Sequence, residues 1–176
     1  MKDDLESIFS NVNDWLKFAE AKSATLIAAN GLVIFGILRL IQRVDLNLLS
    51  KGVLVIVFLC FATSLLFCLS SFVPSLRLPF ELKNNTKSKD DNLLFFADIE
   101  NYTPREYLKK LEMAIDKSIT KPTDDYSDIE SMYAKQIITN SVIARYKFEV
   151  FKRASWLTLI GGVVSMVLVA IYIVET

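Results

Sequence analysis

Residues 52–73 read GVLVIVFLCFATSLLFCLSSFV, and this stretch decides the fold class. It contains no charged side chain, and serines and one threonine are its only polar interruptions. At a rise of about 1.5 Å per residue, roughly 20 residues cross the hydrocarbon core of a bilayer as a helix. The stretch therefore predicts a transmembrane helix, which Pro74 ends.

Two further stretches have the same character. Residues 18–42 are apolar from Ala24 to Ile41, interrupted only by Asn30, two glycines and Arg39, and residues 154–174 are apolar between a basic pair and an acidic end. The whole chain is 52% hydrophobic with a mean hydropathy of +0.36, which is unusual for a soluble domain. We therefore predict an all-α membrane protein with three transmembrane helices, in residues 18–42, 52–73 and 154–174. The short connector between the first two spans predicts an antiparallel helical hairpin.

The remaining segments predict helices outside the bilayer. Residues 1–17 place apolar side chains at helical spacing among acidic ones, which predicts an amphipathic helix that runs on into the first span. Residues 78–92 are a polar linker that cannot bury a core and should be flexible. Residues 93–153 predict a small helical module and a stalk, in which Thr103-Pro104-Arg105-Glu106 is a helix start with a capping box. The helical pattern from Tyr126 to Val174 has no proline, so we expect one long helix that joins the stalk to the third span.

A very apolar run, Leu93-Leu94-Phe95-Phe96, follows the polar linker. A run of this kind needs a packing partner, because a large exposed apolar patch is unfavourable in water. We expect it to dock the module onto its neighbours.

The distribution of basic residues predicts the topology. Lysines and arginines flank the middle module on both sides, whereas the opposite ends of the spans carry few and the C-terminus is acidic. The positive-inside rule then places the N-terminus and residues 77–153 in the cytoplasm and the C-terminus outside. A bacterial inner membrane fits this multi-pass arrangement, and an organelle membrane is the alternative. The flanking basic residues are Arg77, Lys83, Lys87, Lys89, Arg145, Lys147, Lys152 and Arg153.

The composition argues against an enzyme. There is no histidine, which removes the commonest general base and the commonest metal ligand. Cys60 and Cys68 lie on one expected helix, too far apart to form a disulfide with each other. No glycine-rich phosphate loop, metal-ligand spacing or nucleophile elbow occurs in the sequence. We therefore predict no catalytic residue, no metal and no resident cofactor. The 20 basic and 20 acidic residues balance, so nucleic acid polymers are not an expected partner.

Several polar or small residues stand in or beside the expected spans. Asn30 should either hydrogen-bond between helices or line a conduction path, because an unsatisfied amide in hydrocarbon is costly. Glu20 and Lys22 are expected to anchor the first span at the interface, with a gating role as the alternative. Gly161 and Ser165 are spaced to let helix backbones approach closely, although such residues are also simply tolerated in transmembrane helices.

A set of polar residues on the stalk and the module could hold a small anionic ligand. Cations would contact a phosphate and an aromatic ring would contact a base. The same polar face could equally be a hydrogen-bonded seam between protomers, and these alternatives stay open. The candidate ligand-binding residues are Asp98, Tyr102, Tyr107, Gln136, Asn140, Arg145 and Lys147.

A succession of short motifs carries a family resemblance. Phe18-Ala19-Glu20-Ala21-Lys22 leads into Ala28-Ala29-Asn30-Gly31, and after the second span come residues 92–99 (NLLFFADI) and 102–107 (YTPREY). In this order and spacing, and on to residues 136–147 of the stalk, the chain resembles the Pycsar-type transmembrane effector family. Ala97 stands where a glycine is expected before Asp98, so the local backbone there departs from the family pattern.

The resemblance implies a bacterial antiphage effector. A partner cyclase would sense infection and make a cyclic nucleotide, and the effector would bind it through the cytoplasmic module and permeabilise the inner membrane, which is abortive infection. Homo-oligomerisation would be needed, because three helices enclose little of a pore. The alternatives are a membrane-anchored adaptor or oligomerising protein without a small-molecule ligand, and an ungated holin-like toxin, with a membrane-embedded enzyme last.

Overall fold

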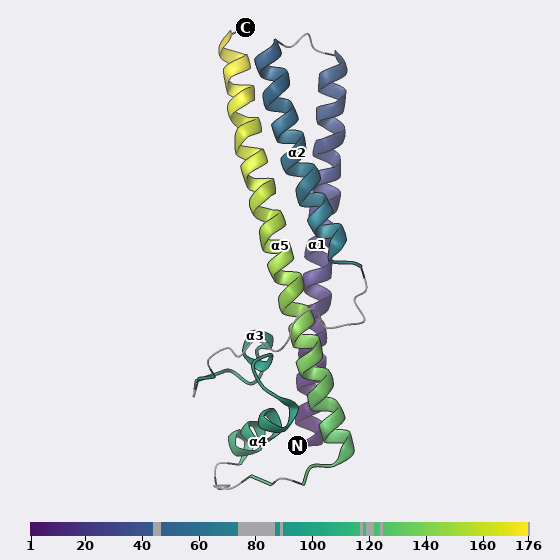
Figure 1. Cartoon of the computed structure of the whole chain (residues 1–176), viewed down its shortest axis with the longest axis vertical. Helices are drawn as coiled ribbons and strands as arrows, with labels where there is room; N and C mark the ends of the chain where they lie inside the picture. Colours follow the sequence, from purple (N-terminus) through teal and green to yellow (C-terminus); the bar gives the residue numbers. More distant parts are fainter. Residues whose placement is uncertain are drawn as a thin grey trace. The chain divides into compact units, whose positions relative to one another are not determined.

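The computed structural model describes residues 1–43, 47–73, 87–88, 90–116, 118, 122–123 and 125–175. Figure 1 shows the helices in these residues, and none of the described residues forms a strand. Three of the helices, α1, α2 and α5, are long and apolar enough to cross a membrane. The predicted fold class, an all-α membrane protein with three spans, is confirmed. The elements are α1 (Lys2–Arg43), α2 (Leu48–Ser70), α3 (Phe96–Ile99), α4 (Pro104–Ile115) and α5 (Asp128–Glu175).

The chain forms two compact units, and α1 and α5 each supply residues to both. The first unit, here called the head, consists of Met1–Ala19 and Ser75–Lys147. The second, here called the bundle, consists of Glu20–Pro74 and Phe148–Thr176. The head therefore contains α3 and α4 with the first parts of α1 and α5, and the bundle contains α2 with the rest of both long helices.

The first part of α1 is amphipathic, as the sequence predicts. Leu5, Ile8 and Val12 are buried, at a spacing that places them on one face of the helix. Asp3 and Asp4 are exposed in the first turn, where negative charge is favourable because of the helix dipole. The helix continues without a break into the bundle, which confirms the prediction that the amphipathic segment and the first span are one helix.

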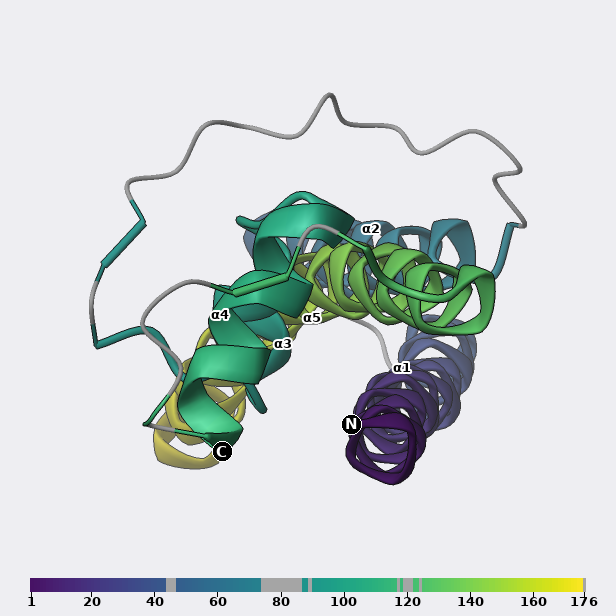
Figure 2. The same ribbon diagram turned by 90° about the horizontal axis from the view of Figure 1, so that it is seen from below.

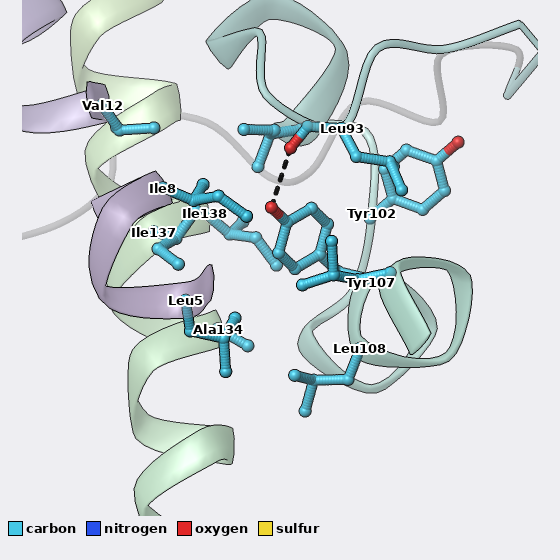
Figure 3. Packing of buried hydrophobic residues seen from close by; sticks show 12 residues of the cluster. Leu5, Ile8, Val12, Leu93, Tyr102, Tyr107, Leu108, Ala134, Ile137 and Ile138 are labelled. Carbon is cyan, nitrogen blue, oxygen red and sulfur yellow. Dashed lines mark hydrogen bonds between the residues drawn. The ribbon is translucent and has the colours of Figure 1, made fainter. Parts of the chain in front are cut away.

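The core of the head joins all four of its helices. Figure 3 shows Tyr107 at its centre, with the hydroxyl of Tyr107 pointing to the Leu93 carbonyl. In Figures 1 and 2 the short helices α3 and α4 lie next to one another in the head. The buried members of this core are Leu5, Ile8, Val12, Leu93, Ile99, Tyr102, Tyr107, Leu108, Leu111, Ala134, Ile137 and Ile138.

The start of α4 has the predicted capping box. The Thr103 hydroxyl accepts a hydrogen bond from the Glu106 amide (3.4 Å), and the Glu106 carboxylate accepts one from the Thr103 amide (3.0 Å). Pro104 takes the first helical position, where its missing N–H is not needed. These reciprocal bonds satisfy donors that the helix itself leaves unpaired, so the prediction is confirmed.

The last helix, α5, runs unbroken from Asp128 to Glu175, which confirms the prediction of one helix through the stalk and the third span. It begins after the predicted start at Tyr126, and a second reciprocal cap explains the difference. The Ser127 hydroxyl accepts from the Glu130 amide (3.3 Å), and the Glu130 carboxylate accepts from the Ser127 amide (3.1 Å).

Leu93 and Phe96 of the apolar run 93–96 are buried in the head, whereas Leu94 and Phe95 are exposed. Leu93 is buried in the core, and Trp15 of α1 contacts Phe95 and Phe96, with ring centroids 6.3 and 5.7 Å apart. Aromatic pairs at such separations add to the area that they bury. The run therefore holds the segment before α3 against α1.

Part of the predicted linker, 78–92, belongs to the head. The Ser88 amide donates to Asp91 (3.0 Å), and Lys110 of α4 donates to the Ser88 carbonyl (2.8 Å). The Ser88 backbone is therefore held by Asp91 and by α4. The rest of the linker and other sequence features lie outside the described residues, namely residues 44–46 of the first connector, Pro74, Arg77 and residues 78–86 and 89.

In the bundle, α2 packs against α1 and α5 (Figure 1). The buried residues of α2 recur at a spacing of three and four, as expected for one face of a helix. The helix begins at Leu48, before the predicted boundary at Gly52, because the Asn47 side chain caps it by accepting from the Ser50 amide (2.8 Å). The buried face of α2 consists of Leu54, Val57, Phe61, Ser64 and Cys68.

Candidate functional site

Two lysines and a tyrosine meet on one side of the head. The Lys110 ammonium lies 4.9 Å from the centre of the Tyr102 ring, and the Lys87 ammonium lies 5.8 Å from it. Lys110 also donates to the Tyr102 hydroxyl (2.5 Å). The ring is 4% exposed, so both cations approach it at the edge of the core.

Two carboxylates neutralise these lysines. Lys87 donates to both oxygens of Glu106 at 2.8 Å, and Asp91 lies 3.9 Å from Lys110 while it accepts from the Tyr102 hydroxyl at 2.5 Å. The group of Lys87, Asp91, Tyr102, Glu106 and Lys110 is here called the lysine cluster. It joins the segment before α3 to α4, and chemically it consists of two cations, each already holding an internal anion.

The surroundings fix the charge states in the lysine cluster. The hydrogen bond from Tyr102 lowers the pKa of Asp91, helped by the Ser88 amide and the charge of Lys110. Burial raises the pKa of Tyr102, and the neighbouring Asp91 raises it further, so the phenol stays protonated and donates. The bonds from Lys87 and Thr103 lower the pKa of Glu106 to about 2. Both carboxylates are therefore ionised at neutral pH.

The Glu106 carboxyl should titrate with a midpoint near 2, well below its ordinary value of 4.5. A lowered pKa means that this group stabilises the folded head above pH 4.5 and that its contribution is lost as the pH falls from 4.5 towards 2. Carbon NMR of the side-chain carboxyl measures the midpoint directly. Lys87→Met should move it upward, whereas Lys135→Met on the exposed side of α5 should leave it unchanged. A wild-type midpoint at the ordinary value would contradict the Lys87 contact.

Of the residues that the sequence predicts for a ligand site, Tyr102 and Tyr107 lie together in the core with ring centroids 6.4 Å apart, and the charge of Asp98 acts on Tyr102, whereas the stalk residues form other contacts. Tyr102 belongs to the lysine cluster. Asp98 accepts from the Asn92 amide (2.9 Å), and Tyr107 is fully buried and donates to the Leu93 carbonyl (2.8 Å). Asp98 and Tyr107 therefore hold the segment before α3 in place.

The polar stalk residues form two other contacts. Gln136 donates to Asn140 (3.0 Å), which in turn donates to Asn13 of α1 (2.7 Å). Arg145 forms an ion pair with Glu100 at the end of α3, and burial raises the pKa of Glu100 although Arg145 opposes this shift. Lys147 is buried on the same helix. Asn140 thus joins α5 to α1, and Arg145 joins α5 to α3.

The sequence analysis missed four members of the lysine cluster as site residues, Lys87, Asp91, Glu106 and Lys110. Lys87 and Asp91 lie in the stretch that composition marks as a linker, Glu106 was recognised only as part of the helix cap, and Lys110 is one of two lysines on α4. A weak signal was present, because Lys110 follows Tyr107 by one helical turn and so lies near the predicted helix start. The partner of Lys110 depends on the path of the preceding segment, which the local pattern does not specify.

A polar network occupies the interior of the bundle. Asn30 of α1 donates to Ser64 of α2 (2.8 Å) and accepts from Thr158 of α5 (3.0 Å). Ser64 donates to the Ala154 carbonyl (2.8 Å) and also lies 2.9 Å from the Thr158 hydroxyl. Asn30 and Ser64 are completely buried. Asn30, Ser64 and Thr158, here called the polar triad, connect all three spans.

Each polar side-chain atom of the triad has a hydrogen-bond partner in the bundle. One amide hydrogen of Asn30 and one hydroxyl hydrogen each from Ser64 and Thr158 serve the bonds to Ser64, Ala154 and Asn30. The triad is therefore satisfied internally, as polar groups in an apolar environment need to be.

The other span residues predicted from the sequence have individual roles in the structure. Lys22 lies 5.7 and 5.6 Å from the ring centres of Phe148 and Phe151 of α5, and Glu20 is partly buried at the start of the bundle. Gly161 is buried against α2, where an added Cβ would lie 2.9 Å from the Phe61 ring. Ser165 donates to the carbonyl of Gly161 in its own helix (2.7 Å), and Gly161 itself is in close contact with α2.

The three apolar helices, the polar triad between them and the separate helical head define a class, that of multi-pass α-helical membrane proteins with a folded unit outside the spans. Within that class the chain matches the Pycsar effector protein domain over residues 4–174. It therefore belongs to the Pycsar effector family, which makes it a membrane effector of antiphage defence. No curated protein and no solved structure shows significant similarity to the chain.

Proposed function

We propose that this protein is the membrane effector of a bacterial antiphage cyclic-nucleotide system, that it binds a cyclic nucleotide through the head, and that it permeabilises the inner membrane so that the infected cell stops growing. Family membership over nearly the whole chain supports the defence role. The three spans with a polar triad between them support an action on the membrane.

The observation that carries the ligand part of the proposal is the lysine cluster. A cyclic nucleotide presents a phosphodiester with one negative charge, and cations held beside an aromatic ring are suited to bind it. Glu106 on Lys87 and Asp91 near Lys110 occupy the positions that a phosphodiester would take. In this proposal the two carboxylates are internal anions that the ligand displaces.

Displacement of the carboxylates by the ligand would change the conformation of the head. Lys87 and Asp91 belong to the segment before α3, whereas Glu106 and Lys110 belong to α4, so these ion pairs hold two segments together. A ligand can shift an equilibrium only through a different affinity for the two states. A head whose lysines bind phosphate instead of carboxylates is such a second state, and α1 and α5 continue from the head into the bundle.

The orientation and the partners follow from the same proposal. The N-terminus and residues 77–153 are cytoplasmic and the C-terminus is outside, because a cyclase that senses infection releases its product into the cytoplasm and the basic residues flank the head. The other partners are the lipid bilayer and further copies of the chain. Exposed apolar side chains such as Leu32, Leu66 and Met166 on the three spans give surfaces for both.

The first test is membrane depolarisation in bacteria that express the protein with and without a panel of cyclic mononucleotide and cyclic oligonucleotide synthases. We expect depolarisation with one class of synthase only. Depolarisation in every culture would favour an ungated toxin, and depolarisation in none would favour an adaptor.

Lys110→Met should abolish the response to the synthase that activates the wild type. The loss of one charge-assisted phosphate contact should weaken binding by about tenfold or more. Titration of the full-length protein in lipid nanodiscs with the individual 3′,5′-cyclic nucleoside monophosphates measures this directly. Lys135→Met removes an exposed lysine from α5 and is the matched control. Equal affinities of the two variants for the cyclic nucleotide would exclude the lysine cluster as the nucleotide-binding site.

A further inference from the structure

The buried interior of the bundle changes character along its length. Towards the end where α1 enters the bundle, the buried side chains are small or polar, namely Ser23, Asn30, Ser64, Cys68, Ser71 and Ala154. Towards the α1–α2 connection they form an apolar cluster of Ile37, Leu54, Val57 and Phe61, with Val164 and Leu168 packed against it. Thus fully buried side chains with oxygen atoms occur in one half of the interior, and the buried side chains described in the other half are apolar.

The hairpin geometry gives the order of these positions. Asn30 pairs with Ser64, and in an antiparallel helix pair this places Ser23 level with Ser71 and Ile37 level with Val57. Ser23 lies about 10 Å below Asn30 on the same buried face. The polar half therefore extends over about two helical turns, from Ser23 to the polar triad.

An unpartnered hydroxyl indicates that water or an ion can bind in this half of the interior. The Ser23 oxygen is completely buried and has no hydrogen-bond partner among the described residues. Buried polar groups without partners are costly in an apolar interior, and water or an ion that enters this space would satisfy them.

The chemistry of the oxygen atoms in this half indicates which ion can bind there. The Asn30 amide oxygen, the Ser64 and Thr158 hydroxyls and the Ala154 carbonyl are neutral, and every buried polar side chain described in the bundle is uncharged. Neutral carbonyl and hydroxyl oxygens replace the hydration shell of a monovalent cation. Anions would need donors instead, and divalent cations favour carboxylates, so K⁺ or Na⁺ fits best.

Next to the polar triad, Phe61 blocks the passage of water and ions through the interior of the bundle. It lies one helical turn from Ser64 on α2, is 4% exposed, and packs directly on Gly161, where an added Cβ would lie 2.9 Å from its ring. A ring of apolar side chains excludes water and ions from a narrow passage by dewetting.

We propose that the permeabilising path runs through the interior of the bundle, with the polar triad as the transit site for a monovalent cation and the cluster around Phe61 as the barrier. The inference rests on the proposed permeabilising function and names its route and its ion. Opening consists of separating the three spans, so that a hydrated cation takes over the hydrogen-bonding partners that the triad has in the closed bundle. Copies that assemble around the path can hold the spans apart, but its lining is the triad.

The test is K⁺ efflux from phosphatidylcholine–phosphatidylglycerol vesicles that contain the full-length protein and trapped carboxyfluorescein, without nucleotide. Phe61→Ala should raise K⁺ efflux about tenfold over the wild type, because the apolar barrier is removed. Phe67→Ala, which changes a more exposed phenylalanine of α2, is the matched control and should stay tight. If circular dichroism shows that the Phe61→Ala protein has lost helicity, Phe61→Val, which keeps an apolar side chain, is measured in its place.

A second substitution identifies the lining. In the Phe61→Ala protein, Thr158→Val should remove most of the K⁺ efflux, because it replaces a triad hydroxyl by a methyl group of the same shape. Thr25→Val is the control, since Thr25 is exposed and donates to the Ala21 carbonyl of its own helix. Equal effects of the two threonine variants, or release of carboxyfluorescein with the K⁺, would place the leak between protomers or in disrupted lipid and overturn the proposal.

The outcome is separable from that of the proposed function. A tight, folded Phe61→Ala protein overturns the internal path even if the wild type depolarises cells in response to a cyclic nucleotide. A leaky Phe61→Ala protein whose leak needs Thr158 supports the path even if no nucleotide activates the wild type.

Discussion

Tyr107→Ala is expected to unfold the head, with a loss of about 3–5 kcal/mol of unfolding free energy. Tyr107 is completely buried at the centre of the core, and its hydroxyl donates to the Leu93 carbonyl at 2.8 Å. The substitution removes the aromatic ring and also leaves that carbonyl without this donor. Urea unfolding of the full-length protein in detergent, followed by tyrosine and tryptophan fluorescence, measures the loss.

Tyr107→Phe separates packing from hydrogen bonding. It keeps the ring and should cost about 1–2 kcal/mol, the range for a buried hydrogen bond whose acceptor stays behind. Tyr146→Ala on α5 is a control, because Tyr146 is only partly buried and its loss should be smaller. If Tyr107→Phe kept its stability but lost the response to a cyclic nucleotide, Tyr107 would be a ligand residue and not a core residue.

The long elements could be predicted because their signals are local. The charge-free stretch around α2 reveals a span by length and composition alone, and the reciprocal bonds of Thr103 and Glu106 follow from residue types three apart. The boundaries were less predictable. Asn47 and Ser127 set the starts of α2 and α5, and both caps lie outside the apolar patterns from which the helices were read.

The partners of the polar residues could not be predicted in the same way. The sequence shows that Asn30 needs a partner, because a lone amide is costly among apolar spans. That the partners are Ser64 and Thr158 depends on the register of α1 against α2 and α5, and each helix offers several serines or threonines. Register between helices depends on side-chain packing along the whole contact, which one sequence does not reveal.

The candidate ligand site illustrates the same limit in the head. Tyr102 was identified from its place beside a capped helix start, but the lysines on its ring come from the predicted linker and from the middle of α4. Gln136, Asn140 and Arg145 share a helix and looked like one polar face. In the structure each contacts a different segment or its own helix, so a shared face did not mean a shared site.

Gly161→Leu is expected to separate α5 from α2 and to cost the bundle at least about 1–3 kcal/mol, the range for overpacking a close contact. An added Cβ would lie 2.9 Å from the Phe61 ring and 3.1 Å from the Cβ of Cys60, and the Cys60 atom is fixed to the backbone. The bundle can accommodate the side chain only if the two helices move apart, which also weakens the Ser64–Ala154 bond between them.

The neighbouring glycine provides a matched control for this prediction. Gly162 has no atom within 4 Å of an added Cβ, so Gly162→Leu adds the same side chain to the same helix without a clash. Cys68 is completely buried in the bundle, and in a Cys60→Ala background its labelling by a maleimide reports how often α2 is uncovered. Gly161→Leu should accelerate this labelling about tenfold or more, since 1.4 kcal/mol corresponds to about a factor of ten. Equal rates for the two leucine variants would mean that the glycine at 161 is merely tolerated and that close approach of α5 to α2 does not hold the bundle together.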